Sequence, residues 1–141
     1  MATSLLSIGT GIRMTDGFPK LFTQAEANDL LPALRQEVET MLASRRQILR
    51  LRPDVGPVLD KASSNGGSNY SGALLAAFEH VQAAVKRIQA HGVVVKDVNS
   101  GLLDFPSERE GRVVFLCWQH DEPTVGHWHD VDAGFAGRRP L

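Results

Sequence analysis

The chain contains a single cysteine, Cys117, so it cannot form a disulfide within itself. This thiol ends the apolar run Val113-Val114-Phe115-Leu116-Cys117, which favours a small core residue in a reducing cytosol over a reactive nucleophile. No apolar stretch approaches the ~20 residues that a membrane-spanning helix needs. The segment Ser4–Ile8 is too short and too polar for the core of a signal peptide. These features predict a cytoplasmic protein with no membrane partner.

An excess of charge of one sign is also missing from the chain. The sequence has 15 basic and 16 acidic residues and a net charge of −1, whereas nucleic-acid binders usually carry a large positive excess. The charge balance therefore argues against nucleic acid as a partner. One arginine cluster, at Arg45, Arg46, Arg50 and Arg52, leaves nucleic-acid or anionic-ligand binding as a third hypothesis. A solvated face is the simpler interpretation of this cluster.

The chain is long enough for one ordinary domain, with 141 residues of which 43% are hydrophobic. Residues 1–20 are rich in Gly, Ser and Thr and show no sustained period, which predicts a flexible or disordered tail. Residues 21–141 are expected to form a single α+β domain. Inside it, the segment 53–70 is rich in Ser, Asn and Gly and is expected to be a mobile loop, because it has little to bury.

Helical periodicity covers most of the first half of the domain. Thr23 and Glu26 have the spacing of a capping box, and the apolar residues that follow repeat every three or four positions. This pattern predicts a helix from Gln24 to Arg50, with a bend or a break at Pro32. A second helix is expected from a cap at Ser71 to about Ala90, where glycine supplies the stop.

After residue 92, the repeat of apolar residues changes from helical spacing to a period of two. Strands are expected at 93–96, 102–105, 112–118 and 124–129, the last two forming a hairpin. The glycine-containing end, residues 134–141, is expected to be an ordered extended segment. The predicted architecture is α+β, with two long antiparallel helices followed by a small, mainly antiparallel sheet of three to four strands.

The densest group of chemically capable side chains is His127 and His129 in Gly126-His127-Trp128-His129. Residues two apart on a strand point to the same face, so both imidazoles would project together as convergent metal ligands. A carboxylate would supply a third ligand, and the candidates are Asp97, Asp104, Glu122, Asp130 and Asp132. The competing interpretation is structural, with His127 exposed and His129 bonded to a backbone group. The sequence leaves the metal, and any other cofactor, unidentified.

Trp118 and Trp128 are the only tryptophans and lie on strands that are expected to pair. Across the hairpin they would face each other or sit diagonally, where aromatic contacts stabilise a sheet. Packing is the favoured interpretation, and a platform for stacking a ligand is the alternative.

The chain resembles an uncharacterised bacterial family, domain of unknown function 2203. The motifs that carry the resemblance are Phe22-Thr23, Glu26-Ala27-Asn28, Leu30-Leu31-Pro32, Lys96-Asp97, Gly101-Leu102-Leu103-Asp104-Phe105-Pro106, Gly111, Leu116-Cys117-Trp118, Trp128-His129 and Gly134-Phe135-Ala136-Gly137-Arg138. The resemblance covers residues 21–141 and implies no activity. Its pattern includes Trp128 and His129 but not His127. It therefore points to His129, Asp97, Asp104 and Arg138 as the polar set to test.

Two functions follow as hypotheses of different classes. The leading one is a small module without catalysis that self-associates as a homodimer and serves in binding or as a scaffold. Its basis is that long amphipathic helices on a small sheet leave apolar surface that one core does not cover. The alternative is a metal-dependent or general-base enzyme built on His129 and nearby carboxylates, with a small-molecule ligand that the sequence does not identify.

Overall fold

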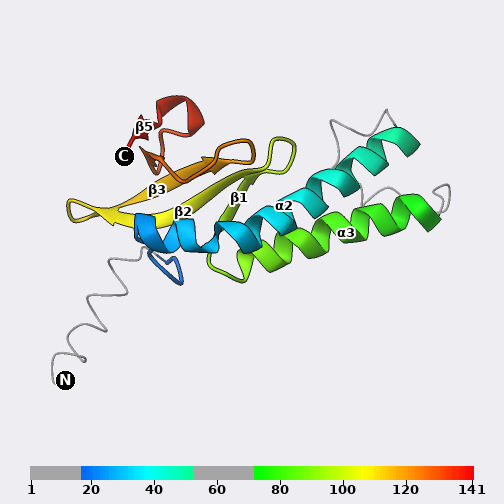
Figure 1. The fold of residues 1–141 in the computed structure, drawn as a ribbon, viewed down its shortest axis with the longest axis horizontal. Coiled ribbons are helices and arrows are strands. Elements are labelled where there is room, and N and C mark those ends of the chain that lie inside the picture. Colours follow the sequence, from blue (N-terminus) through cyan, green and yellow to red (C-terminus); the bar gives the residue numbers. More distant parts are fainter. Residues whose placement is uncertain (1–16, 53–71) are drawn as a thin grey trace, which may run out of the picture.

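Two long helices and an antiparallel sheet make up the part of the protein that the computed structural model describes, residues 17–52 and 72–141 (Figure 1). The elements are α2 (Gln24–Leu51), α3 (Gly72–Gln89), β1 (Val94–Asp97), β2 (Leu102–Arg109), β3 (Arg112–Gln119), β4 (His127–Asp130), the 3₁₀ helix η3 (Phe135–Gly137) and β5 (Arg139–Pro140). The loop expected at 53–70, and residues 1–16 of the expected tail, lie outside the described residues.

The first helix begins where the sequence predicts. Thr23 Oγ1 accepts a hydrogen bond from the Glu26 N–H, and the Glu26 carboxylate accepts one from the Thr23 N–H, which completes the capping box. The helix does not break at Pro32 but continues to Leu51, with the proline ring on its exposed side. Its buried stripe, of Ala27, Leu31, Leu34, Val38, Met41 and Ile48, packs against α3 and the sheet.

The sheet has five strands rather than the three to four that the sequence predicts, and confirms the α+β class. The order is β1-β2-β3-β4-β5, and every neighbouring pair is antiparallel. The additional strand is β5, in which Arg139 pairs with Trp128 and Pro140 with His127. Two residues are too few to show an alternating pattern, so the sequence indicates only an extended segment there.

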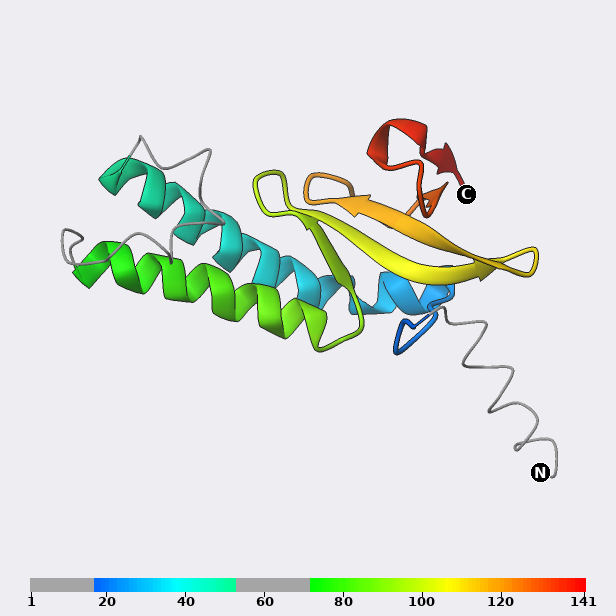
Figure 2. The ribbon, with the colours of Figure 1, turned by 180° about the vertical axis from the view of Figure 1, so that it is seen from behind.

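The two faces of the sheet differ in what covers them. One face packs on the helices, and its core residues are Leu103, Phe105, Val114, Leu116, Trp118 and Trp128. On the other face, the alternate residues of the same strands include Asp104, Phe115, Cys117, His127 and His129. The C-terminal segment lies on this second side, away from the helices (Figures 1 and 2). We call the two sides the helix face and the opposite face.

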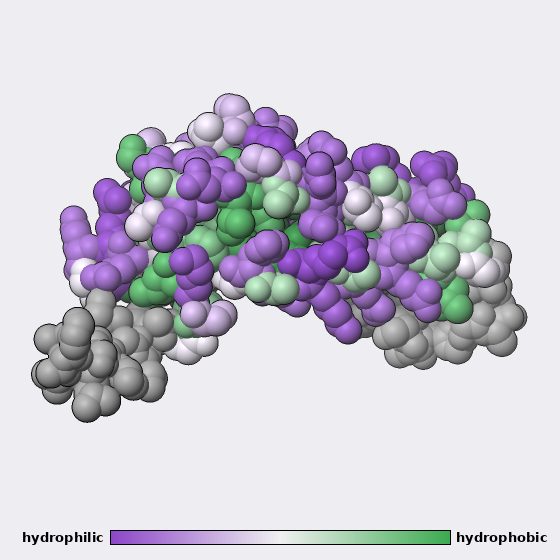
Figure 3. All heavy atoms as spheres, turned by 60° about the horizontal axis from the view of Figure 1, so that its bottom comes forward, coloured by the Kyte–Doolittle hydropathy of each residue, from purple (hydrophilic) through white to green (hydrophobic). Residues whose placement is uncertain are grey.

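Neither helix of the described residues is long and apolar enough to cross a membrane. The surface seen in Figure 3 is mainly hydrophilic, with apolar patches between the polar side chains. The large apolar side chains that stay exposed belong to the far ends of the helices and to the C-terminal segment, at Leu51, Leu75, Val131, Phe135 and Leu141.

Candidate metal centre

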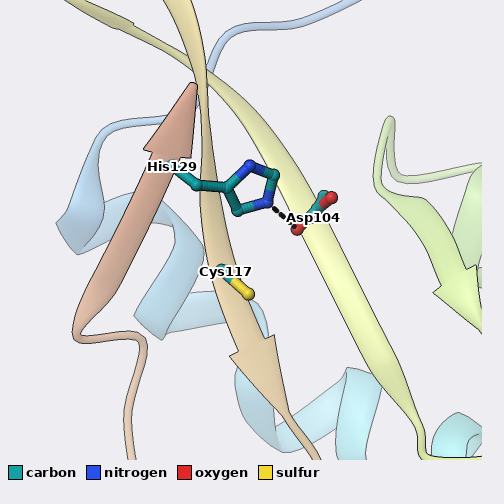
Figure 4. A group of neighbouring side chains, drawn as sticks. All are labelled: Asp104, Cys117 and His129. Atoms are coloured by element: carbon teal, nitrogen blue, oxygen red, sulfur yellow. Dashed lines mark hydrogen bonds and ion pairs between the residues drawn. The ribbon is translucent and has the colours of Figure 1, made fainter. Parts of the chain in front are cut away.

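Three neighbouring strands each place one side chain that can bind a metal ion on the opposite face of the sheet. Asp104 on β2 is the direct cross-strand partner of Cys117 on β3. His129 on β4 pairs with Phe115, two residues before Cys117, so it lies diagonally across from the thiol. Figure 4 shows the three side chains projecting to the same side of the sheet, with the imidazole directed at the carboxylate. We call Asp104, Cys117 and His129 the buried trio.

The buried trio is both compact and inaccessible to solvent. One ligand atom from each residue can be chosen so that all three atoms lie within 4.8 Å of one another. The exposed fraction is 0% for Asp104 and Cys117 and 1% for His129. Carboxylate, thiol and imidazole groups are rarely buried together without a partner of opposite charge or an ion, because the loss of hydration is costly.

The hydrogen bonds of His129 define the tautomer of its ring. Nδ1 lies 2.7 Å from the backbone oxygen of Asp130. Because a carbonyl oxygen only accepts hydrogen bonds, Nδ1 carries a hydrogen and donates it. Nε2 lies 3.1 Å from Oδ1 of Asp104, and a single proton shared between these two atoms makes that bond. Without that proton, the lone pair of Nε2 points toward the carboxylate and is available to a cation.

Asp104 is the least satisfied member of the trio. Its Oδ2 atom is buried and has no hydrogen-bond partner. Burial raises the pKa of this carboxyl group above its ordinary value, and the neighbouring His129 ring offsets the effect only in part. An unpaired buried polar atom costs about 1–3 kcal/mol. Asp104 therefore meets the cluster through Oδ1, which lies next to His129, while its second carboxylate oxygen is buried without a hydrogen-bond partner.

Cys117 has the properties of a protonated thiol rather than a nucleophile. Burial, together with the nearby Asp104 carboxylate, raises its pKa to about 11. The guanidinium of Arg138 approaches the sulfur, with 3.9 Å between Nη1 and Sγ. Both ring nitrogens of His129 are already engaged by Asp104 and Asp130, so the imidazole has no free nitrogen to accept the thiol proton. The cluster is thus not arranged as a cysteine–histidine catalytic pair.

A second polar layer borders the trio on the side of the β3–β4 connection. Glu122 accepts two hydrogen bonds from the guanidinium of Arg138, one of them 3.1 Å long, and a third from the Gln119 N–H at 2.8 Å. Burial alone would raise the pKa of Glu122, but these hydrogen bonds outweigh it and hold the pKa below its ordinary value. Glu122 and Arg138 therefore form a stable ion pair beside Cys117.

His127 lies on the same face as His129, as the sequence predicts, and directly opposite Cys117. Its Nδ1 atom is buried and has no hydrogen-bond partner. The nearest acidic oxygen, Oε2 of Glu122, is 3.8 Å away, too far for a hydrogen bond. Of the side chain as a whole, 35% is exposed.

The other residues that the sequence singles out lie elsewhere. Asp97 stabilises the β1–β2 turn, where its carboxylate accepts hydrogen bonds from the Asn99 N–H and the Ser100 hydroxyl. Trp128 is buried on the helix face, away from His129, and three guanidinium groups surround its ring, those of Arg109, Arg112 and Arg139. Trp118 is fully buried in the same layer.

Cys117 is the member of the site that sequence reasoning assigns only to the core. The structure places it on the face away from Leu116 and Trp118, opposite His127, through a strand register that the sequence does not define. Every residue from Val114 to Trp118 is buried, so the strand shows no alternating pattern that separates the two faces. The motif Leu116-Cys117-Trp118 also belongs to the resemblance noted above. Periodicity alone does not separate a buried thiol in a core from one in a ligand cluster.

The fold and the site define an α+β protein with a buried cluster of metal-ligand side chains. The family model described as "Uncharacterized conserved protein (DUF2203)" matches residues 20–141, and the chain belongs to this family. No curated protein and no solved structure matches the chain.

Proposed function

We propose that this protein binds a divalent transition-metal ion, zinc being the best fit, through Asp104, Cys117 and His129. The observation that carries the proposal is the unpartnered Oδ2 atom of Asp104, buried within a cluster that also holds a thiol and an imidazole. The ion would link β2, β3 and β4, and the protein is in this sense a metal-stabilised binding module.

The donor set is that of a zinc site. Zinc accepts carboxylate oxygen, thiolate sulfur and imidazole nitrogen, whereas magnesium and calcium prefer oxygen ligands alone. The hydrogen bond from Nδ1 of His129 to the Asp130 carbonyl is the second interaction that metal-ligating histidines usually make, and Nε2 can bind the ion once the proton shared with Asp104 has left.

Charge balance supports an ion with two positive charges. The ionised forms of Asp104 and Cys117 carry two negative charges together, and His129 is neutral when it binds a metal through Nε2. A divalent ion makes this buried assembly neutral, which removes the cost of a net charge in an apolar environment. Two protons leave when the ion enters, one from the thiol and one from the Asp104–His129 hydrogen bond.

The geometry requires only small adjustments. Zinc bonds of about 2.0–2.3 Å in a tetrahedral site place neighbouring ligand atoms about 3.3–3.8 Å apart. The trio atoms lie within 4.8 Å of one another, with 3.1 Å between Nε2 and Oδ1. Shifts of about 1 Å or less, within the reach of side-chain rotation, bring the three atoms into this range.

A structural role fits the burial better than a catalytic one. Two cavities among the described residues, of about 440 and 180 Å³, are lined by other residues and not by the trio. Structural zinc sites are closed to solvent, while catalytic sites keep a position open to water or substrate. The enzyme hypothesis therefore has less support than a binding role without catalysis.

The test is a zinc titration of the chelator-treated protein, prepared without a histidine tag. We expect one equivalent of zinc to bind, and about 4 kcal/mol of added stability at a free zinc concentration a thousandfold above the dissociation constant. C117S should bind zinc at least a hundredfold more weakly, because the thiolate is lost. H80N, which changes an exposed histidine of α3 outside the site, is the matched control and should bind as the original protein does.

Zinc binding to C117S with unchanged affinity would contradict the proposal. The same holds if the folded original protein, monitored by circular dichroism, takes up no stoichiometric zinc, cobalt or nickel. Because C117S is close in size to the original residue, its fold can be checked in parallel by the same spectrum.

Self-association as a homodimer stays a prediction. The exposed apolar residues at the far ends of the helices, Leu51 and Leu75, are consistent with a helical contact surface. Light scattering at micromolar concentration tests it, and a strict monomer would contradict it.

A further inference from the structure

The proposed zinc site has three ligands, but structural zinc sites almost always have four. The following step rests on the proposed function and concerns the fourth position. Within the described residues, two further side chains of the right chemistry border Cys117: Glu122 and His127. They differ in how many hydrogen bonds their oxygen or nitrogen atoms already form.

Glu122 is committed to other partners. Both of its carboxylate oxygens accept hydrogen bonds from Arg138, and one also accepts from the Gln119 N–H. A bidentate arginine–carboxylate pair is among the stronger side-chain interactions in proteins. Moving Glu122 onto a metal would break three hydrogen bonds and leave the partly buried Arg138 guanidinium beside a cation.

His127 has the opposite properties. The β3–β4 register places it directly across from Cys117, on the same face as His129. Its Nδ1 atom is buried without a hydrogen-bond partner, so turning the ring breaks no hydrogen bond of this atom and gives up only its 3.8 Å contact with Oε2 of Glu122. Imidazole is also a neutral ligand, and its addition keeps the site at zero net charge with a divalent ion.

We infer that His127 is the fourth ligand and turns its ring from Glu122 toward Cys117 when zinc binds. The completed site contains one carboxylate, one thiolate and two imidazoles, contributed by three neighbouring strands. His127 is also the one ligand of the four with substantial exposure, 35% of its side chain against 1% or less for the others.

X-ray absorption spectroscopy of the zinc-loaded protein tests this inference, because it counts sulfur and imidazole ligands separately. We expect one sulfur and two imidazoles in the original protein. In H127N we expect one imidazole, with a water oxygen in the vacated position, and zinc affinity reduced at least tenfold. The matched control is H120N, since His120 belongs to the same β3–β4 connection and is 33% exposed, but pairs with Glu39 outside the site. It should behave as the original protein.

The possible outcomes test the assignment of His127 separately from the proposed function. One imidazole in the original protein, or an unchanged ligand count and affinity in H127N, overturns the assignment of His127 and leaves the three-ligand proposal intact. No stoichiometric zinc in the original protein overturns the proposed function itself. Because His127 is partly exposed, H127N is expected to fold, and a circular dichroism spectrum verifies this before the measurement.

Discussion

Successive residues of β2 and β3 are buried on both sides of the sheet, in two different ways. On the helix face, Phe105 and Leu116 pack against apolar side chains of the helices. On the opposite face, Asp104 and Cys117 are just as inaccessible, but they are themselves polar groups and one carboxylate oxygen has no hydrogen-bond partner. The first arrangement stabilises the fold by about 25 cal/mol per Å² of apolar surface. The second arrangement lowers stability unless the unpaired oxygen gains a hydrogen bond or binds a cation.

This difference indicates that the two faces have different roles. The helix face determines the fold and needs nothing beyond the chain. The opposite face contains buried polar groups whose burial the proposed ion would explain, and we expect its contribution to stability to depend on metal and on pH. Substitutions on the two faces are therefore expected to respond differently to zinc and to pH.

The largest expected effect is on the helix face. Phe105 is fully buried and makes an edge-to-face contact with Phe22, with 5.4 Å between ring centroids. Phe105→Ala should lower the free energy of unfolding by about 3–5 kcal/mol, because it removes apolar contacts and leaves a cavity. Urea denaturation with and without zinc should give the same loss. A loss that disappears on adding zinc would contradict the separation of the two faces.

A smaller effect is expected on the opposite face of the metal-free protein. The pKa of Cys117 is raised from the ordinary 9.0 to about 11 in the folded state, so the folded protein retains this proton while the unfolded chain loses it. Stability from this group is complete below pH 9 and falls as the pH rises toward 11. The expected loss is about 2 kcal/mol across this range.

Cys117→Ala isolates that contribution. The difference in unfolding free energy between the original protein and this variant should shrink from pH 9 to pH 11, when both are measured in chelator by urea denaturation. A difference that stays constant over this range would show that the thiol is not protonated preferentially in the folded state. A difference that grows would show that folding lowers the pKa of the thiol instead of raising it.

The sequence is sufficient to predict the helices and the strands with the clearest pattern. The capping box at Thr23 and Glu26 locates the start of α2, and its end falls one residue beyond the expected Arg50. The long strand β3, expected at 112–118, spans Arg112–Gln119. In these segments local propensity and burial act in the same direction, so the pattern alone identifies the element.

The sequence is less informative where pairing across the chain decides the structure. The short strand β5 exists because its backbone bonds to β4, and no local signal distinguishes it from coil. The grouping of Asp104, Cys117 and His129 depends on the register of three strands, which the sequence does not define. His127 and His129 share a face by strand geometry alone, which is why the paired histidines are recognisable before the thiol is.

The most direct test of the proposed site is anomalous diffraction at the zinc absorption edge, from crystals of the protein without a histidine tag, grown with zinc. We expect an anomalous peak between Asp104, Cys117 and His129, about 2.3 Å from the sulfur and about 2.0–2.1 Å from the imidazole nitrogen. Zinc bound only elsewhere, with the hydrogen bond between His129 and Asp104 intact, would contradict it.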